Sequence, residues 1–331
     1  MKVLLTGAAG GIGSTLGAHL YEAGHDLTLI DNFRNGYLSN LLYKNRFYGN
    51  FINKSINDPT INDDIDEGYD CLIHLAAVTS LPDCQINATD AFDTNVSGTA
   101  AMLEIARNKN IPKVIFASTS AVYENNKESL FTEELNLNPS LNYSSSKYMA
   151  ENICNSYRDL YDMQITILRF FNVFGPRQDI NRKNPPLLNY LVREIVNDRT
   201  PYLHSDGNQA RDYVYVEDVI KLIEICLLKK ANSTYNVCTG QLISVKDIVG
   251  YASEAFNYQI KPIYRDASML WNTYPELFKG HFPLKKAVVS QETNKFSLGS
   301  NKKAQKELSW EPKINLKELF INVINQIRSN Y

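Results

Sequence analysis

Short apolar runs alternate with segments of helical spacing through the first half of the chain. The run at residues 3–5 contains no polar residue, as expected of a strand that is buried on both faces. Residues 14–23 then place Leu16 and Leu20 on one helical face, and Gly24 stands where a helix usually ends. The same alternation predicts strands within 27–30, 47–56, 69–77, 114–117 and 164–169, and helices over 91–108 and 143–161. This order is typical of an α/β fold.

The regular pattern is interrupted near Val173, where Gly and Pro become frequent and polarity rises as far as Pro186. We place the boundary between two lobes there. The second part is expected to hold helices at 187–196, 218–228, 302–308 and 316–327, and strands within 205–216 and at 234–238. Ser244 is expected to cap another helix, with Asp247 in the capping-box position. Aromatic residues gather within 261–297, and we expect them to pack in an irregular loop.

The turn between the first strand and the first helix reads TGAAGGIG, residues 6–13. Gly7 allows the tight turn, Gly10 lets backbone N–H groups approach a pyrophosphate, and Gly13 lets the helix pack close to the sheet. The helix N-terminus adds a partial positive charge. Asp31 ends the second strand, where a carboxylate can accept hydrogen bonds from an adenosine ribose. A glycine triad alone would also suit an unrelated turn, but the full strand, turn, helix, strand and acid order predicts a dinucleotide site.

The residues near Asp31 also bear on which dinucleotide binds. Arg34 could in principle meet a ribose 2′-phosphate, but the Asp31 carboxylate would repel that phosphate. NAD is therefore predicted over NADP. The strand ending at residues 74–77 finishes in small residues, which let a cofactor lie against the strand end.

Composition narrows the class of protein. The 331 residues are 44% hydrophobic and 21% charged, with a net charge of −2, so a nucleic-acid surface is not indicated. No apolar run approaches membrane-spanning length, and no signal peptide is recognised at the start. The five cysteines form no C-x-x-C pair, which favours reduced thiols in the cytoplasm. The five histidines show no metal spacing, so we expect no metal site.

Candidate catalytic residues follow the fifth predicted strand. Hydroxyl groups gather at residues 118–123, at the strand end where open α/β sheets bind ligands. Tyr143 and Lys147 lie four apart and share a helix face. Tyrosine is a poor base with its usual pKa near 10, but a neighbouring ammonium group lowers the pKa by favouring the phenolate. We therefore expect Lys147 to lower the pKa of Tyr143.

The motifs together resemble the NAD-dependent sugar-nucleotide epimerase/dehydratase family, which belongs to the extended short-chain dehydrogenases/reductases. The resemblance rests on TGAAGGIG, Asp31, HLAA (74–77), NVSGT (95–99), STSAVY (118–123), YSSSK (143–147), RFFNVFGPRQ (169–178), RDYVYVEDV (211–219), YNVCTG (235–240) and LSWEP (308–312). These motifs cover most of the chain in the expected order. They are more specific for the family than for one reaction.

The resemblance implies a Rossmann-like doubly wound parallel sheet and a smaller mixed α/β C-terminal substrate lobe. The NAD-binding lobe is expected at 1–172, with about 211–239 returning to it, and the lobe that binds the nucleotide diphosphosugar at 173–210 and 240–331. The cofactor is expected to contact Gly7, Gly10, Gly11, Ile12, Gly13, Asp31, Asn32, Ile56, Leu75, Ala76, Ala77, Asn95, Tyr143 and Lys147.

The resemblance also implies roles for individual residues. Thr119 is expected to bind the reacting sugar hydroxyl, Tyr143 to be the acid/base, and Lys147 its electrostatic partner. Asn172 and Arg211 are expected on the substrate diphosphate, and Ser80 is a further candidate for contacting the sugar. The sequence departs from the family where Ser55-Ile56 replaces an Asp–hydrophobic pair and where Glu124 replaces the usual Gly after Val-Tyr.

The reaction expected first is epimerisation at C4 of a nucleotide diphosphosugar through a 4-keto intermediate. Thr119 is followed by Ser120 and Ala121, not by the Asp-Glu pair of the family's 4,6-dehydratases. Leu141-Asn142 precede Tyr143, where decarboxylases typically have an Arg. Dehydration, decarboxylation and 4-ketoreduction stay as alternatives, as does a non-catalytic NAD-binding protein. A homodimer is expected, while the nucleotide and the sugar are not specified by these residues.

Overall fold

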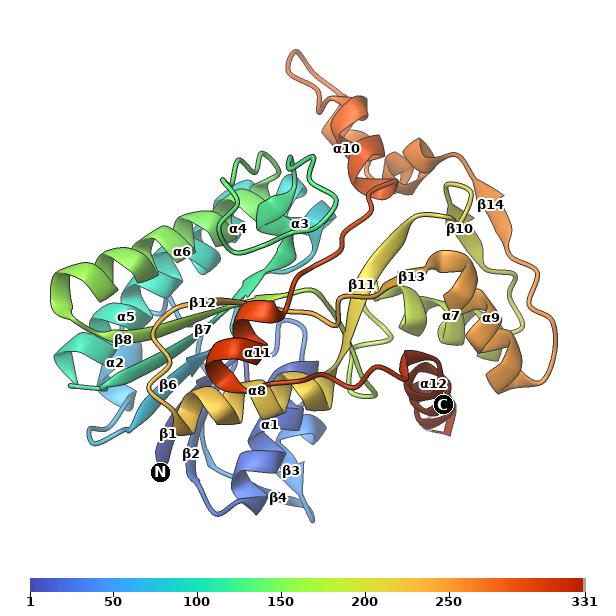
Figure 1. Ribbon diagram of the computed structural model, residues 1–331. Helices are drawn as coiled ribbons and strands as arrows, with labels where there is room; N and C mark the ends of the chain where they lie inside the picture. Colours follow the sequence, from blue (N-terminus) through green and yellow to red (C-terminus); the bar gives the residue numbers. More distant parts are fainter. Residues whose placement is uncertain (330–331) are drawn as a thin grey trace.

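The computed structural model describes residues 1–329, and a seven-stranded parallel sheet forms its centre (Figure 1). The strands run across the sheet in the order β12 (Thr234–Val237), β8 (Gln164–Phe170), β7 (Lys113–Thr119), β6 (Cys71–His74), β1 (Lys2–Thr6), β2 (Asp26–Ile30) and β5 (Asn50–Ile52). The chain extends the sheet from β1 toward β5, and then returns to extend it from β6 in the opposite direction. This is the doubly wound arrangement, with its switch point beside β1, and the fold prediction is confirmed.

Both faces of the sheet are buried. Val3 and Leu5 lie in one apolar core, while Leu4 between them lies in a second core on the opposite face. Because successive side chains of a strand point to opposite faces, a strand covered on both sides buries all of them, and apolar residues are favoured at every position. The uninterrupted apolar run at the start of the chain is therefore explained by its central position.

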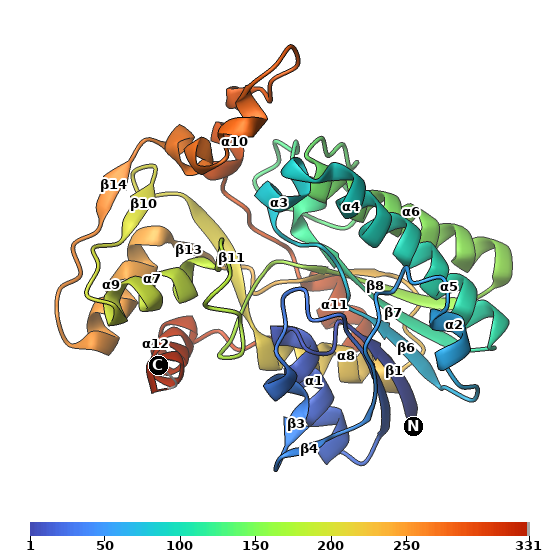
Figure 2. The ribbon, with the colours of Figure 1, turned by 180° about the vertical axis from the view of Figure 1, so that it is seen from behind.

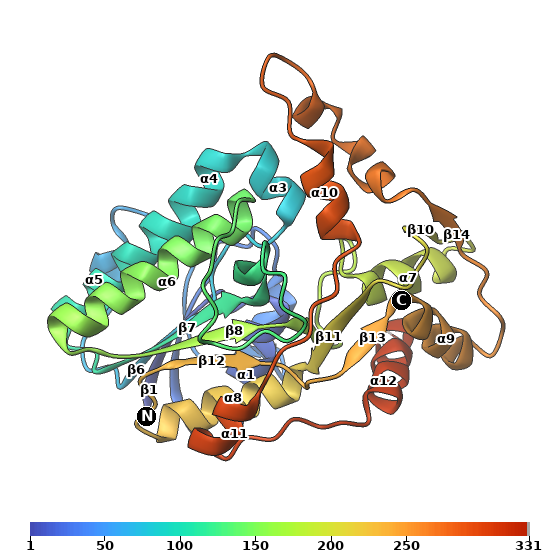
Figure 3. The ribbon, with the colours of Figure 1, turned by 45° about the horizontal axis from the view of Figure 1, so that its top comes forward.

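Helices form the outer layers. On one face α1 (Gly11–Glu22) packs against α8 (Val216–Leu228), and on the other α5 (Gly98–Asn108) packs against α6 (Asn142–Tyr161), as Figure 3 shows. The remaining helices and 3₁₀ turns are α2 (Ile61–Asp64), α3 (Leu81–Ile86), α4 (Ala88–Phe92), α7 (Leu187–Val196), α9 (Val245–Phe256), α10 (Lys286–Thr293), α11 (Lys302–Leu308), α12 (Leu316–Ser329), η1 (Leu38–Leu41), η3 (Ser120–Tyr123), η4 (Ala267–Thr273) and η5 (Pro275–Phe278). In the described part of the chain, no helix combines the length and apolar character needed to span a membrane.

Smaller sheets accompany the central one (Figure 2). They consist of β13 (Leu242–Ser244), β11 (Ala210–Tyr215) and β9 (Asn172–Phe174), of β10 (Tyr202–His204) with β14 (Ile263–Arg265), and of β3 (Leu42–Tyr43) with β4 (Arg46–Phe47). Helix α12 packs against α7 and α9 beside the three-stranded sheet, where the rings of Phe174 and Phe320 stack at 4.1 Å between centroids. Strand β12 lies in the central sheet, whereas β11 lies in the small one. The division into two lobes stays a prediction.

Two local expectations are confirmed. The Ser244 side chain accepts from the Asp247 N–H and the Asp247 carboxylate accepts from the Ser244 N–H, as the capping box requires. The chain is helical throughout 91–108, although a π-helical turn η2 (Asp93–Ser97), which the spacing did not predict, lies between α4 and α5. A π turn accommodates an extra residue, and here it brings the Asn95 side chain to the backbone of Val78.

Candidate active site

A cavity of about 1060 Å³ opens beyond the carboxyl ends of the central strands. Residues of the glycine turn line one part, and residues of β9, β11 and the segments around them line another. Such a crevice at the switch point is where open α/β sheets bind ligands. The cavity is also large enough for a ligand of two linked parts, since single ligand pockets have volumes of roughly 300–1,000 Å³.

The glycine turn has the close backbone approach that its sequence predicts. Gly7 has φ of +70°, and a Cβ there would lie 2.7 Å from the Ala76 nitrogen. A Cβ on Gly13 would lie 2.1 Å from the Gly7 oxygen. Neither position therefore tolerates a larger side chain without movement of the backbone. All of the predicted turn residues line the cavity, namely Gly7, Gly10, Gly11, Ile12 and Gly13.

Asp31 joins the end of β2 to the glycine turn. Its carboxylate accepts hydrogen bonds from the N–H groups of Ala9 at 2.9 Å and Phe33 at 2.7 Å. Burial raises the pKa of Asp31, although these N–H donors oppose the rise. Asp31 and Asn32 line the cavity. The predicted contact of Asp31 with a ribose stays a prediction.

Arg34, the residue that could meet a 2′-phosphate, has a carboxylate partner within the protein. Its guanidinium group lies 2.5 Å from Asp90 on α4, and this contact raises the pKa of Arg34. The cation is therefore already paired at the edge of the cavity. This arrangement, together with Asp31, fits NAD better than NADP.

The predicted residues of the next strands divide into two groups. Ile56, Leu75, Ala76 and Ala77 line the cavity. Asn95 and Ser80 do not belong to its lining, and both side chains hold backbone in place instead. Asn95 is fully buried and exchanges hydrogen bonds of 2.8 and 2.9 Å with the N–H and C=O of Val78. Ser80 caps α3 by accepting from the Asp83 N–H at 3.4 Å.

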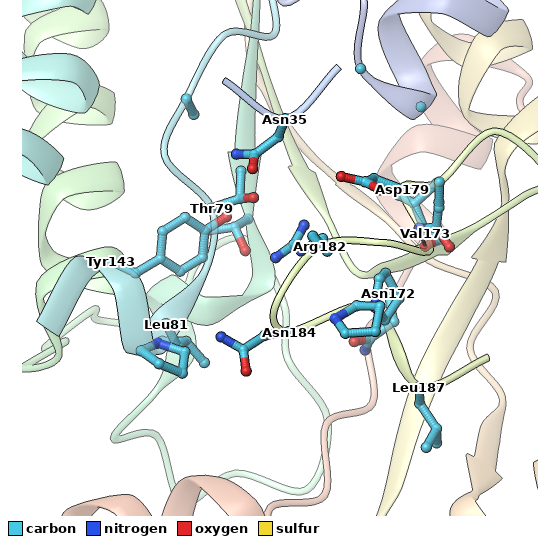
Figure 4. A pocket seen from close by; sticks show the side chains of 18 of the residues that line it. Asn35, Thr79, Leu81, Tyr143, Asn172, Val173, Asp179, Arg182, Asn184 and Leu187 are labelled. Atoms are coloured by element: carbon cyan, nitrogen blue, oxygen red, sulfur yellow. Dashed lines mark hydrogen bonds between the residues drawn. The ribbon is translucent and has the colours of Figure 1, made fainter. Parts of the chain in front are cut away.

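The structure brings Thr119, Tyr143 and Lys147 to the same cavity. Thr119 is the last residue of β7, and its hydroxyl accepts a hydrogen bond of 3.1 Å from the Ala121 N–H. Tyr143 lies in the first turn of α6, and Figure 4 shows its ring directed into the cavity toward Thr79 and Arg182. Lys147 follows one turn later on the same helix.

Burial shifts the pKa values of Tyr143 and Lys147 away from their usual values. Burial raises the pKa of Tyr143 to about 12, and the neighbouring Thr119 hydroxyl and Arg182 charge offset only part of that effect. Lys147 is only 3% exposed, and burial lowers the pKa of Lys147 to about 8. Its ammonium group lies 4.1 Å from the centroid of the Phe116 ring. In the chain by itself the pKa of Tyr143 is therefore raised, because the loss of hydration dominates. The lowering contribution of Lys147 stays a prediction.

A buried ion pair lies behind the catalytic group. Arg169 on β8 binds Glu151 on α6 at 2.8 Å, and both side chains are almost fully buried. The Ser118 hydroxyl donates to the same carboxylate at 2.5 Å, and Arg169 also donates to the Tyr123 oxygen at 2.7 Å. This network ties α6 to the ends of β7 and β8. The sequence analysis did not identify it, because its members are separated by up to 51 positions along the chain.

Asn172 and Arg211 approach the cavity from the three-stranded sheet. Asn172 donates to the Asp212 carbonyl oxygen at 3.2 Å, and Arg211 donates to the Glu292 carbonyl oxygen at 2.8 Å. Burial lowers the pKa of Arg211. A partly buried guanidinium group whose hydrogen-bond acceptors among the described residues are carbonyl oxygens fits an anionic ligand. Their predicted contact with a diphosphate stays a prediction.

The segment 261–297 covers part of the cavity. It contains β14, η4, η5 and α10, and in Figures 1 and 2 α10 and its neighbours project above the sheet. Trp271 and Tyr274 are buried in a separate small core with Val289, which confirms the expected aromatic packing. Phe282, in contrast, is 98% exposed. The residues of this segment that line the cavity are Arg265, Met269, Leu270, Trp271, Thr273, Glu292 and Thr293.

Several lining residues were missed by the sequence analysis, and Figure 4 shows Asn35, Thr79, Arg182 and Asn184 among them. Thr79 is next to the predicted Ser80, and the alternation of side chains along an extended segment was the signal that could have separated the two. Arg182 and Asn184 lie in the Pro-rich stretch after β9, which carries no periodic pattern. Only the fold places that stretch opposite Tyr143.

Comparison with known proteins agrees with this geometry. Residues 3–238 match the profile described as the NAD dependent epimerase/dehydratase family. The UDP-glucose 4-epimerase of Mycolicibacterium smegmatis is 32% identical over 252 residues, which cover 75% of this chain and 80% of that protein.

Solved structures agree as well. The UDP-glucose 4-epimerase of Thermotoga maritima, solved with UDP-glucose, has a TM-score of 0.86 and 27% identity, with 100% of this chain and 99% of that chain covered. The UDP-N-acetylglucosamine 4-epimerase of Methanobrevibacter ruminantium M1, solved with UDP-N-acetylmuramic acid, has a TM-score of 0.86 and 26% identity, with the same coverage. The chain belongs to the NAD dependent epimerase/dehydratase family.

Proposed function

We propose that this protein is an NAD-dependent isomerase that epimerises a nucleotide diphosphosugar, at C4, through a 4-keto intermediate. The observation that carries the proposal is one continuous cavity lined by the glycine turn, by Thr119, Tyr143 and Lys147, and by Arg211. A dinucleotide and a diphosphosugar can therefore meet beside a proton-transferring group. The similar proteins named above as 4-epimerases support the same reaction.

The side chains act on the sugar as follows. Tyr143, as a phenolate, accepts the proton of the 4-hydroxyl, while Thr119 binds that hydroxyl and holds it in line. NAD, when held by the glycine turn and Asp31, would supply the chemistry of hydride acceptance and return at C4. Epimerisation follows when the keto sugar presents its other face before the hydride returns. These steps require no acid or base beyond Tyr143. The proton that Tyr143 accepts in the first step returns to the sugar oxygen in the second, and the phenolate is restored.

The charge of the site must compensate for the burial of Tyr143. A pKa of about 12 for Tyr143 leaves little phenolate at neutral pH. Positive charge close to the phenol stabilises the phenolate, and the candidates are Lys147 and the oxidised nicotinamide ring. Because Lys147 itself is buried, with a pKa of about 8, its charge is present below that pH and decreases above it.

Dehydration, the first alternative reaction, needs an acid and a base directly after Thr119. Residues 120–123 form the short turn η3, so Ser120 and Ala121 occupy the positions after Thr119 where a 4,6-dehydratase carries an acid and a base. A decarboxylase or a 4-ketoreductase is retained as an alternative, since either starts from the same 4-keto chemistry. A non-catalytic NAD-binding protein is the least favoured, because Thr119, Tyr143 and Lys147 are all present.

We also propose the finer organisation of the protein. Residues 1–172, with about 211–239, form the NAD-binding lobe, and residues 173–210 and 240–331 mainly bind the substrate. The protein works in the cytoplasm as a homodimer. All five cysteines are buried free thiols, which supports a reducing compartment. Light scattering during size-exclusion chromatography tests the dimer.

Incubation with UDP-, GDP-, CDP- and dTDP-sugars, with NAD and without added reductant, tests the reaction. NMR of the products should show a C4 epimer that approaches equilibrium from both directions. The variant Tyr143→Phe serves as the matched control, since it retains the ring but lacks the hydroxyl. A stable 4-keto-6-deoxy sugar or released CO₂ would contradict the proposal.

A further inference from the structure

We propose that Glu124 is a positioning residue that sets the relative placement of Tyr143 and Thr119. The inference rests on the proposed function for its catalytic readout. It starts from a departure in the sequence, since Glu124 stands where the family usually has Gly. Glu124 is only 6% exposed, and so is not a solvated surface residue.

The start of α6 lacks a capping side chain of its own. The residue at the cap position is Leu141, whose side chain makes no cap hydrogen bond. The first N–H groups of a helix have no partner within the helix, and a Leu cap leaves them to other parts of the protein. Tyr143 lies only two residues after this cap. Any fraying of the first turn would therefore move the proposed base.

Glu124 supplies acceptors at this point. Its carboxylate accepts hydrogen bonds from the Leu141 N–H at 3.0 and 3.2 Å, from the Ser140 hydroxyl at 2.7 Å and from the Ser140 N–H at 3.3 Å. The Gln85 side-chain oxygen accepts from the Asn142 N–H at 2.6 Å. A carboxylate at a helix N-terminus is also favoured by the helix dipole.

Glu124 is connected to Thr119 through a short rigid turn. The Thr119 hydroxyl caps η3 by accepting from the Ala121 N–H, and the Glu124 N–H donates to the Ala121 carbonyl oxygen at 2.9 Å. Thr119 and Glu124 are therefore the two ends of one hydrogen-bonded turn. The Glu124 carboxylate links that turn to α6, so one side chain relates the two catalytic groups that face the same sugar hydroxyl.

The test compares Glu124→Ala, Glu124→Gln and a matched control. Asp247→Ala is that control, because Asp247 also accepts from a serine N–H, at 2.9 Å, and from its hydroxyl, at 2.6 Å, at the start of α9. Steady-state kinetics with the sugar identified by the NMR panel give kcat and KM, and hydrogen–deuterium exchange reports on residues 140–147.

We expect Glu124→Ala to lower kcat about 10- to 100-fold, because a displacement of roughly 1 Å can cost about 100-fold in rate. KM should change by less than about threefold, since the diphosphate contacts are remote. Glu124→Gln should restore most of kcat, because its amide oxygen still accepts from Leu141. Exchange at 140–147 should increase in Glu124→Ala and not in Asp247→Ala.

An unchanged kcat in Glu124→Ala overturns the inference, as does a loss confined to KM or an equal loss of kcat in Asp247→Ala. If the wild-type protein turns over none of the sugars, the proposed function fails, and the exchange measurement alone then tests the positioning role of Glu124. Increased exchange at 140–147 specific to Glu124→Ala then supports the positioning role, and unchanged exchange overturns it.

Discussion

The charge on Lys147 gives the sharpest test of the proposed chemistry. With a pKa of about 12, Tyr143 is ionised in roughly one molecule in 10⁵ at pH 7. Activity near neutral pH would require a reduction of about 5 pH units, or about 7 kcal/mol. At an effective dielectric constant of about 20, one positive charge held roughly 5 Å from the phenol oxygen would contribute about 3 kcal/mol, or about 2 pH units. Two charges at such a separation, which we propose to be Lys147 and the nicotinamide ring, would supply most of the required reduction.

We predict that Lys147→Met raises the pH at which turnover reaches half of its maximum by about 2 units on the acid side. The direction of this pH shift follows from the phenolate form of Tyr143, which is the active one. Because the loss of a nearby cation raises the pKa of Tyr143, activity then needs a higher pH. Turnover at pH 7 should fall about 100-fold, while methionine retains much of the side-chain volume.

The alkaline side provides the matched control. Burial lowers the pKa of Lys147 to about 8, so wild-type turnover should decrease as the pH rises through that value and the cation is lost. Lys147→Arg keeps its charge at high pH and should lack this decrease. The assay is kcat measured from pH 5.5 to 10 with saturating substrate. An acid-side midpoint that is the same in wild type and Lys147→Met would refute the reasoning.

Three further predictions concern other parts of the site. Tyr143→Phe should retain NAD binding, measured by calorimetry, but lower turnover by about 10²–10⁴-fold, and near-normal turnover would mean that another group is the base. The wild-type protein should bind NAD at least about tenfold more tightly than NADP, and equal dissociation constants would contradict this preference. Asp31→Ser should reduce the ratio of the two dissociation constants, because no carboxylate then repels a 2′-phosphate. Asn95→Ala should lower the free energy of unfolding by about 2–4 kcal/mol in urea titrations, since it leaves the buried N–H and C=O of Val78 without partners. An effect on NAD affinity alone would contradict this prediction and indicate a direct cofactor contact.

Local sequence determined much of the framework. The apolar runs at 3–5 in β1 and 114–117 in β7 had to be strands covered on both faces, because no polar side chain interrupts them. The glycines of the turn had to lie where backbone meets backbone, and the positive φ of Gly7 agrees. The spacing of Tyr143 and Lys147 placed them on one helix. Each of these inferences uses contacts between residues close together in the chain.

Tertiary structure decided what distant residues do to one another. The sequence could not show that Asn95 and Ser80 hold backbone, because those contacts depend on a π-helical turn and on a helix cap. It could not show that burial would raise the pKa of Tyr143, since hydration depends on every element packed around the phenol.

The role of Glu124 has the same origin. In the sequence it is an acidic residue in place of a glycine, 17 positions before Leu141. In the folded chain its carboxylate accepts from the Leu141 N–H at the start of α6, which has no partner within the helix. Such an N–H group needs an acceptor wherever the helix begins, but only the fold brings the turn after β7 close enough to supply one. The local chain therefore specified the helix and its catalytic pair, and the packing of separate elements specified how that pair is held.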